Sequence, residues 1–516
     1  MSARAPSHCL RRSVHDSLPD LHRGPKADQE ADGEVSAEEL GKSIENIFAA
    51  FQANYHVEAA LLYSFDQAVA SFNVKGDLMK RFTLLLGIVL MAAPAGAQDY
   101  GIRTHTLKNG MKILVQEDHS IPNVALYIFY KIGSRNERPG TTGLSHFFEH
   151  MMFNGAKKYG PRLFDETMEA AGGSNNAYTS NDLTVYQDWF PRSALEKIFD
   201  LEADRIQNLS FDEKMIESER GVVASERRTS VDANNMGILN EQLAATAYTA
   251  HPYQWPVVGW MVDIESWTME DLKNHFQIGY SPANATMVVT GDVTLDEIVK
   301  LAQKYIEPIP SRGLPPKVTT REPEQLGERR IVVKKFAQLP IVMMAYHVPE
   351  SSNPDYYPLQ VLQTVLFEGE SSRMYQRLVD KDQLALSISG GSSFSFDPAL
   401  FEIVARPKEG IQPEAVEKAV YEELDRMKNG LVSDKELEKA KNILLADFYR
   451  RMKTISGKAN ALGSYELFFG DYRKMFTAAG DYSKVTKEDL QRVASKYLAD
   501  KNRTVATLIP EKEETR

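Results

Sequence analysis

Alternating and clustered apolar positions divide the chain into segments typical of strands and helices. Alternation or short apolar runs predict strands at residues 101–116, 124–131, 330–335 and 341–347, and a Ser/Gly-rich hairpin at 386–405. Apolar residues at helical spacing predict helices at residues 144–153, 164–171, 192–233 and 357–367. The strands and helices mix within each half of the chain, which predicts an α+β fold.

The two halves repeat each other at both of their ends. Thr268-Met-Glu-Asp-Leu272 and Thr486-Lys-Glu-Asp-Leu490 each open an amphipathic helix with a threonine at the N-cap, and a β-rich run follows each helix. Ile121-Pro122 and Leu339-Pro340 each precede a strand, with the same separation along the chain as the first pair. This agreement in spacing predicts an internal duplication, and therefore two homologous mixed α/β-sheet domains.

A proline-rich segment lies between the two halves. Residues 307–316 contain four prolines, and a charged stretch continues from there to Arg330. We therefore expect a first domain at 98–315, a linker at 316–330 and a second domain at 331–510.

The region before residue 98 has the pattern of an export signal. Residues 79–81 are Met-Lys-Arg, residues 82–93 are an apolar run, and Ala95-Gly96-Ala97 forms a cleavage site. The run is shorter than the roughly 20 residues that a transmembrane helix needs. We therefore predict a signal peptide at 79–97 and no stable membrane anchor after its removal. Residues 1–78 are then a gene-model extension or disordered, and the alternative is a cytoplasmic region anchored by the apolar run.

Composition restricts the compartment and the partners. The one cysteine is Cys9, so the predicted mature chain has neither a disulfide nor a cysteine ligand, and export without cysteines fits a bacterial periplasm, with secretion as the alternative. The net charge of −11 argues against nucleic acid as a partner, because phosphate binding needs a concentrated basic face.

His146-Phe-Phe-Glu149-His150 is the segment with the clearest chemistry. On a helix the two imidazoles lie one turn apart on the same side, and Glu149 lies beside them. Neutral imidazoles are zinc ligands, a catalytic zinc takes three protein ligands and a water, and the order His-x-x-Glu-His is the inverzincin signature. The alternative is a pair of surface histidines on an amphipathic helix, so a third ligand would decide.

Two downstream glutamates compete for the position of third ligand. Glu219 and Glu226 lie two turns apart on one predicted helix, which separates them by about 10 Å along the axis. Only one of them can therefore contact the metal, and geometry alone does not choose between them.

The chain at this point resembles the pitrilysin or insulinase family of zinc metallopeptidases, which includes the β subunit of mitochondrial processing peptidase. Glu219-Arg-Gly-Val-Val-Ala-Ser-Glu226 matches the distal ligand motif of that family. The resemblance implies that Glu226 is the third zinc ligand, that Glu149 is the general base and that Glu219 is an auxiliary carboxylate. It also implies one Zn²⁺ per chain and a clam-like arrangement of the two domains.

A glycine-rich segment resembles the family's substrate strand. Residues 172–180 read Gly-Gly-Ser-Asn-Asn-Ala-Tyr-Thr-Ser, and strand-like residues 183–190 follow them. In the family this stretch leads into an edge strand beside the zinc that pairs with the substrate backbone, which implies substrate contacts at Asn176, Ala177 and Tyr178. An ordinary turn into a strand is the alternative.

The second half departs from the pattern of a complete enzyme. No histidine follows His347, so this half cannot form a second two-histidine site. Long single-chain members of the family hold substrate with an arginine and a tyrosine, where this chain has Val379 and Leu386. We therefore expect a heterodimer with a metal-free homologous subunit, and a homodimer is possible.

The predicted function is zinc-dependent endopeptidase activity on peptides or unstructured polypeptides, through a zinc-activated water. The alternative is a non-catalytic structural or peptide-binding subunit of the same fold. His251 is interpreted as structural, and Arg373, Tyr375 and Arg377 are assigned either to a substrate chamber or to a solvated helix end.

Overall fold

The first half of the chain forms a six-stranded mixed sheet in the computed structural model, which describes residues 101–511. The strands stand in the order β1-β2-β6-β3-β5-β4, with β2 and β6 parallel and the other pairs antiparallel. Strands β3 and β6 lie at the centre and are almost wholly buried. The bounds are β1 Ile102–Thr106, β2 Lys112–Glu117, β3 Asn123–Tyr130, β4 Ser174–Thr179, β5 Thr184–Pro191 and β6 Ala285–Gly291.

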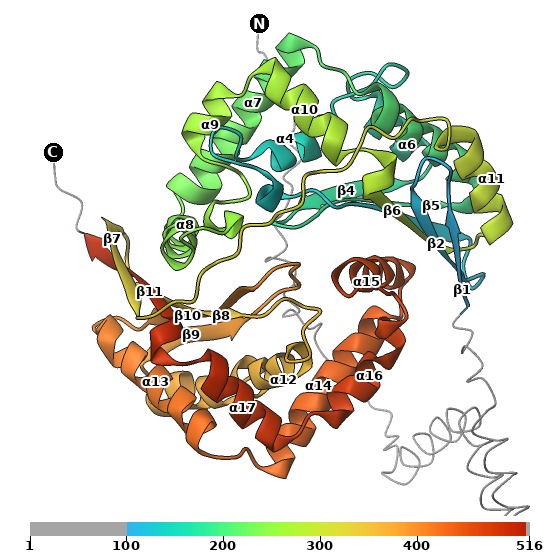
Figure 1. Ribbon diagram of the computed structural model, residues 1–516. Coiled ribbons are helices and arrows are strands. Elements are labelled where there is room, and N and C mark those ends of the chain that lie inside the picture. Colours follow the sequence, from blue (N-terminus) through green and yellow to red (C-terminus); the bar gives the residue numbers. More distant parts are fainter. Residues whose placement is uncertain (1–100, 512–516) are drawn as a thin grey trace, which may run out of the picture. The chain divides into compact units, whose positions relative to one another are not determined.

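The second half repeats this sheet with one strand fewer. Its order is β7-β11-β8-β10-β9, again with one parallel pair, β7 and β11, followed by antiparallel pairs. Without β1, the two orders correspond strand for strand, which confirms the expected pair of mixed α/β domains (Figure 1). The bounds are β7 Arg329–Phe336, β8 Ile341–Val348, β9 Ala385–Gly391, β10 Ala399–Pro407 and β11 Arg503–Glu511.

Helices cover both sheets. Those of the first half are α4 Leu144–Met151, α5 Leu163–Ala170, α6 Leu195–Asn208, α7 Glu213–Arg227, α8 Asn235–Ala247, α9 Met261–Ser266, α10 Met269–Gly279 and α11 Leu295–Tyr305. Those of the second half are α12 Tyr356–Phe367, α13 Pro413–Asn429, α14 Asp434–Arg451, α15 Ile455–Phe468, α16 Lys474–Lys484 and α17 Lys487–Tyr497. Short 3₁₀ or π segments occupy Ser134–Asn136, Arg192–Ala194, Arg228–Asp232, Pro252–Gln254, Pro282–Asn284, Tyr375–Lys381 and Asp500–Asn502.

Both predicted threonine N-caps are present, and one predicted helix is divided. Thr268 and Thr486 each accept a hydrogen bond from the backbone of the third helical residue and complete a capping box. The predicted helical run at 192–233 is wrong as a continuous element, because α6 ends at Asn208. Asp212 starts α7 by accepting hydrogen bonds from the backbone N–H groups of Lys214 and Met215, both at 3.0 Å.

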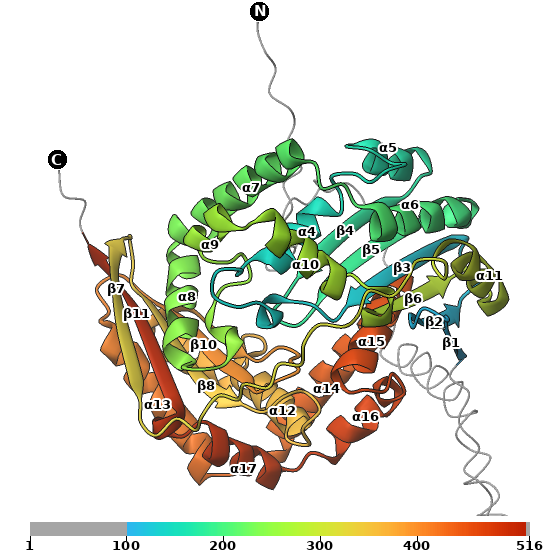
Figure 2. The same cartoon turned by 45° about the horizontal axis from the view of Figure 1, so that its top comes forward.

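Each half contributes one helix to the sheet of the other. Helix α8, from the first half, packs on β7, β8 and β11, while α15, from the second half, packs on β3 and β6 (Figure 2). Gly463 on α15 permits close contact, because a Cβ there would lie 2.2 Å from the ring of Phe129. One face of the first sheet therefore shares a hydrophobic core with the second half, and the opposite face packs against α4.

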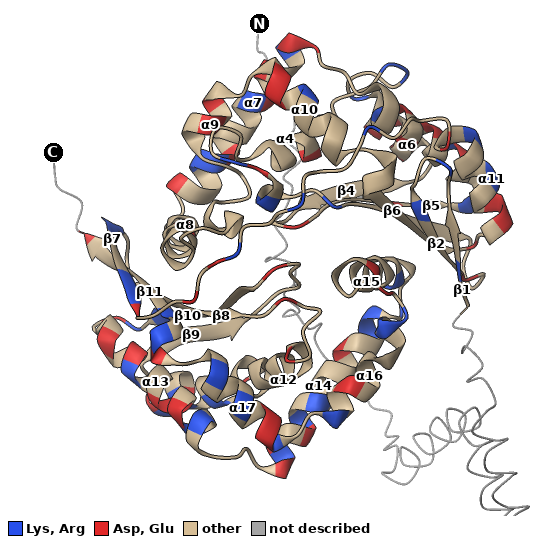
Figure 3. Ribbon diagram, in the orientation of Figure 1, with Lys and Arg blue, Asp and Glu red and all other residues tan. Residues whose placement is uncertain are grey.

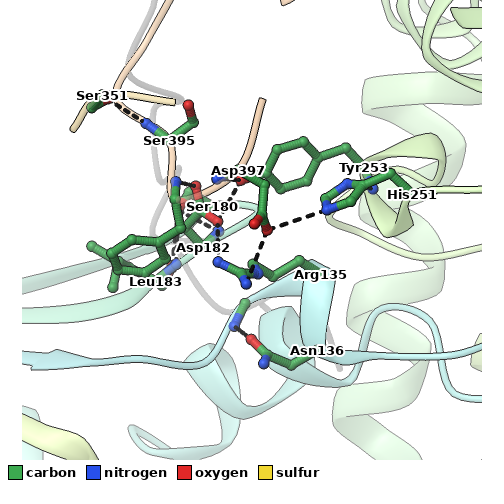
Figure 4. A network of polar contacts seen from close by, with 12 residues as sticks. Arg135, Asn136, Ser180, Asp182, Leu183, His251, Tyr253, Ser351, Ser395 and Asp397 are labelled. Atoms are coloured by element: carbon green, nitrogen blue, oxygen red, sulfur yellow. Dashed lines mark hydrogen bonds and ion pairs between the residues drawn. The ribbon is translucent and has the colours of Figure 1, made fainter. Parts of the chain in front are cut away.

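A buried polar network also joins the halves (Figure 4). Arg135 places one guanidinium nitrogen 3.3 Å from Asp182 Oδ1 and the other 2.9 Å from Asp397 Oδ2. Tyr253 donates its hydroxyl to Asp182 at 2.6 Å. His251 is buried, with Nε2 3.2 Å from Asp397 Oδ2, which agrees with its structural interpretation. The network holds the β4–β5 turn against the β9–β10 loop.

The connection between the halves runs from α11 to β7 without helix or strand. Strand β7 begins at Arg329, slightly before the expected domain start at 331, and the domain limits stay predictions. The predicted signal peptide at 79–97 and the segment 1–78 lie outside the described residues. Among the residues that are described, no helix is long and apolar enough to cross a membrane.

Candidate metal centre

Helix α4 carries the predicted zinc motif and buries its apolar side. The side chains that face the core are those of Leu144, Phe147, Phe148 and Met151. His146 and His150 project from another side, one turn apart, with ring centroids separated by 4.7 Å. Burial of the apolar residues therefore determines which side of α4 presents the imidazoles.

The start of α4 is fixed by a glycine and a buried carboxyl group. Gly143 has φ of 90°, and a Cβ there would lie 2.5 Å from the carbonyl oxygen of Val258. The two oxygens of Glu137 accept hydrogen bonds from the N–H groups of Gly143 and Ser145, each at 2.7 Å. Burial raises the pKa of Glu137 to about 8, and the two N–H donors oppose that rise. Glu137 thereby satisfies N–H groups that a helix start leaves without partners.

Helix α7 brings the carboxylate of Glu226 to the two imidazoles. Glu226 Oε1 lies 3.7 Å from His146 Nε2, and Glu226 Oε2 lies 3.3 Å from His150 Nε2. One potential ligand atom from each residue falls within 4.8 Å of the others. Among the described residues this is the one group of His, Cys, Asp or Glu side chains that could hold a metal ion.

Glu219 contacts the other nitrogen of His150. Its Oε1 lies 2.7 Å from His150 Nδ1, and its Oε2 accepts a 2.5 Å hydrogen bond from Asn154 Nδ2. Glu219 and Glu226 thus lie on opposite sides of one imidazole ring. Burial lowers the pKa of His150, but the two carboxylates outweigh it and raise that pKa to about 9.

The donor set fits zinc. Two imidazole nitrogens and one carboxylate are the ligands of a catalytic site with three protein ligands. A carboxylate on the far nitrogen of a ligating histidine fixes its tautomer and its orientation, which is the position of Glu219. Glu149 is buried on α4 and near enough to His150 for its charge to raise the imidazole pKa.

Comparison with known proteins assigns the family. Residues 112–259 match the family model described as "Insulinase (Peptidase family M16)", and residues 266–444 match the one described as "Peptidase M16 inactive domain". The zinc protease PqqE of Helicobacter pylori is 32% identical over 446 residues, which cover 84% of this chain and 100% of that protein. The chain belongs to the M16 peptidase family. This confirms the resemblance drawn from the sequence motifs.

Other relatives agree with the M16 assignment. The mitochondrial-processing peptidase subunit beta of Lentinula edodes is 27% identical over 416 residues, covering 78% of this chain and 88% of that protein. The crystal structure of a protease from Helicobacter pylori superposes with a TM-score of 0.77 at 32% identity, covering 79% and 99% of the two chains. The periplasmic protease PqqL from Escherichia coli shares the fold, with a TM-score of 0.66 at 18% identity, covering 81% and 48%.

The edge strand of this M16 chain is β4, which begins directly after Gly172-Gly173. Strand β4 contains Asn176, Ala177 and Tyr178, pairs with β5 and lies at the end of the sheet beside α4. The strand expected at 183–190 is β5, which lies inside the sheet between β3 and β4. Most of its side chains are buried, as expected of a strand inside a sheet. Asn176 is exposed, Tyr178 is half-buried and Ala177 is buried.

Arg373 and Arg377 are held by carboxylates on α14 and α13. Arg373 Nε donates to Glu436 at 2.7 Å, and Arg377 Nη2 donates to Glu422 at 2.6 Å. Figure 3 shows basic and acidic residues intermixed along these helices. Both arginines are therefore paired within the second half, and the choice between a solvated helix end and a substrate chamber stays a prediction.

The two positions expected to lack the substrate-holding pair differ in their surroundings. Val379 lies in the π segment Tyr375–Lys381 and packs on the core. Leu386 lies on the edge strand β9 and is 53% exposed. The sequence did not reveal Glu137 and Tyr186, which support α4, or Asn154, which donates to Glu219, because these residues lie outside the motif and follow no local pattern.

Proposed function

We propose that this chain is a zinc-dependent endopeptidase that hydrolyses peptides or unstructured polypeptides. The observation that carries the proposal is the convergence of His146, His150 and Glu226, with Glu149 on the same short helix. The zinc protease name of the Helicobacter pylori relative supports it.

His146, His150 and Glu226 would hold the metal, and Glu219 would orient His150. A bound zinc ion polarises the scissile carbonyl and lowers the pKa of water toward about 7. Glu149 accepts a proton from the attacking water as the water oxygen adds to the carbonyl carbon. The same carboxyl group then gives that proton to the amine nitrogen as the C–N bond breaks.

Strand β4 is the proposed binding site for the substrate backbone. An extended peptide added to a sheet edge forms main-chain hydrogen bonds that every sequence can make. The position of β4 at the edge of the sheet and against α4 supports this role for Asn176, Ala177 and Tyr178. Such binding favours unstructured substrates, since a folded protein has its backbone groups already paired.

A second subunit is proposed to complete the substrate site. One support is that Val379 and Leu386 occupy the positions where an arginine and a tyrosine would hold substrate. The other is that Leu386 exposes a large apolar side chain on an edge strand. A metal-free homologous chain is the proposed partner, with a homodimer as the second form. Full peptidase activity in a monodisperse monomer would contradict both.

The proposed compartment is the bacterial periplasm. The basic start, apolar run and Ala-Gly-Ala sequence at 79–97 support export. Determining the N-terminal residue of the protein recovered from the periplasm tests this proposal, and we expect Gln98.

The second candidate function is a non-catalytic subunit. The observation in its favour is that residues 266–444 match a model described as an inactive domain. Cleavage of a quenched, unstructured peptide discriminates the two functions. We expect cleavage that stops on addition of a chelator and returns with Zn²⁺, whereas zinc-loaded protein without cleavage, alone or with its partner, would support the non-catalytic role.

A further inference from the structure

Helix α4 is too short to orient its own ligands. It has eight residues, and isolated helices of fewer than about 12 residues are marginal in water. Its orientation must therefore come from the structure beneath it. Side-chain packing resists displacement of such a helix, but hydrogen bonds to its backbone fix its rotation more directly, because they are directional.

Two buried tyrosines make such bonds to the core side of α4. Tyr186 donates its hydroxyl to the carbonyl oxygen of Phe148 at 3.0 Å, and Tyr280 donates to the carbonyl oxygen of Ser145 at 3.2 Å. Both side chains are almost completely buried, at 1% and 0% exposure. Burial raises the pKa of each, so both remain neutral hydroxyl donors.

The two carbonyl groups are those that directly precede site residues. The carbonyl carbon of Ser145 is bonded to the nitrogen of His146, and that of Phe148 is bonded to the nitrogen of Glu149. Each hydroxyl therefore holds the planar peptide group that joins the preceding residue to His146, a proposed ligand, or to Glu149, the proposed base. A small rotation of α4 would move both side chains relative to Glu226 on α7.

The tyrosines themselves stand on fixed elements. Tyr186 belongs to β5, and the guanidinium of Arg205 lies 4.5 Å from its ring centroid, itself paired with buried Glu202. Tyr280 is the C-cap of α10, and its ring packs against Phe148 at 5.6 Å. The hydroxyls are thus attached to the sheet and to a second helix rather than to mobile loops.

We propose that Tyr186 and Tyr280 are positioning residues. Their hydroxyl groups set the rotation of α4 and thereby direct the side chains of His146 and Glu149 toward the proposed zinc site. This inference rests on the proposed zinc-peptidase function. It assigns no chemistry to the tyrosines, which act only through the helix backbone.

The same ring cluster offers a matched control. Tyr130 on β3 is fully buried and lies 5.9 Å from Tyr186 and 5.0 Å from Tyr280 between ring centroids. Its hydroxyl has no hydrogen-bond partner among the described residues. Tyr130→Phe therefore removes a buried hydroxyl from the same cluster without releasing α4.

The test compares Tyr186→Phe, Tyr280→Phe, the double variant and Tyr130→Phe with the wild type. We would measure zinc affinity by competition with a chelator, kcat and KM on a quenched peptide, and Tm of the metal-free proteins. The double variant should lose about 10 to 100-fold in zinc affinity or kcat, the size typical of groups that orient metal ligands, with KM unchanged. Tyr130→Phe should match the wild type in zinc affinity, kcat and KM, and its Tm should be equal or higher, because the variant removes a buried hydroxyl that has no partner among the described residues.

Wild-type zinc affinity and kcat in the double variant would overturn the inference. So would an equal loss in Tyr130→Phe, which would indicate general loosening of the cluster. Where the double variant does not fold, the two single variants decide by the same criteria, each with a smaller loss. A wild-type protein that binds no zinc would instead refute the proposed function, so the two failures are distinguishable.

Discussion

The two halves of the chain share a sheet topology, but their corresponding helices differ in which side chains they bury. Helix α4 follows the central strand β3, and α12 follows its counterpart β8. Helix α4 leaves His146 and His150 half-buried and facing the carboxylates of α7. Helix α12 buries most of its residues, and α14, α16 and α17 pack against it.

The difference between α7 and α14 explains this contrast. Helix α7 follows α6 in the first half, as α14 follows α13 in the second. Helix α7 brings Glu219 and Glu226 to α4, whereas α14 brings Ala440 and partly buried leucines into the core. Uncompensated carboxylates are costly to bury, so an acidic helix face requires a cation or a histidine opposite it. The histidines of α4, which α12 lacks, and the carboxylates of the neighbouring α7 therefore distinguish the half with the candidate metal site, although both halves share the sheet topology.

The exchange of α8 and α15 makes the halves dependent on each other. A fragment of residues 98–315 would lack α15 and expose the apolar face that Phe129 and its neighbours form. We expect this fragment to show no cooperative unfolding by itself, whereas the full chain cleaved between α11 and β7 should remain associated. Cooperative thermal unfolding of the isolated fragment, followed by calorimetry, would show that the halves are independent.

Removal of Glu226, the proposed third ligand, should separate the proposed metal function of α7 from its structural role. Glu226→Ala should lose more zinc affinity than the roughly 10 to 100-fold typical of groups outside the ligand set. Glu217→Ala is the matched control on α7, because Glu217 is exposed and pairs only locally with Arg220. Competition with a chelator measures both, and full zinc affinity in Glu226→Ala would identify another residue as the ligand.

A larger residue at Gly463 should weaken the contact between α15 and the first sheet. Gly463→Val places atoms where the Phe129 ring lies, so we expect the free energy of unfolding to fall by about 1 to 3 kcal/mol. Gly480→Ala, at an exposed position of α16 with open space at the Cβ, should stabilise the protein by about 0.5 to 1 kcal/mol. Denaturant unfolding compares the two, and an unchanged Gly463→Val protein would show that α15 is not tightly packed.

The charged edge of α15 should contribute least. Lys458 lies 2.6 Å from Asp118 Oδ2 and, with Ser120, lowers the pKa of Asp118 to about 2. Because the folded pKa lies below the unfolded value of about 3.9, this stabilisation is present above that pH and is lost as pH falls through 2. Lys458→Ala should cost about 0.5 to 1 kcal/mol at pH 7.

The pH dependence checks the cause of that loss. The difference between Lys458→Ala and wild type should shrink as pH falls toward 2 and vanish below it, where Asp118 is protonated. Lys501→Ala removes a more exposed ion pair with Glu324 and should cost less at pH 7. A cost for Lys458→Ala that does not change between pH 7 and pH 2 would point to lost packing instead.

Local patterns in the sequence predicted most of the strands, the two threonine caps and the three residues of the zinc motif. These features depend on neighbours within one or two turns, so alternation and helical spacing reveal them. The break between α6 and α7 was missed because residues 208–211, Asn-Leu-Ser-Phe, contain neither glycine nor proline. The edge position of β4 was missed because a short sequence segment does not identify its sheet neighbours.

The supports of the site were beyond prediction from sequence. Tyr186 lies on β5 and Tyr280 is the C-cap of α10, and they reach α4 only after the sheet and helices have packed. The exchange of α8 and α15 could not be predicted for a similar reason, because an apolar helix face does not indicate which sheet it packs against. Glu226 was selected over Glu219 through the family resemblance, and the structure adds that each contacts a different nitrogen of His150.

The central claim is that α4 carries a catalytic zinc site in which Glu149 moves the proton. The most direct measurement is zinc content together with peptide cleavage for Glu149→Gln, which keeps the shape of the side chain and removes its basicity. The account predicts about one zinc ion per chain, as in the wild type, and a loss of roughly 10² to 10⁴-fold in kcat. A Glu149→Gln protein that cleaves at the wild-type rate with its zinc in place would contradict it.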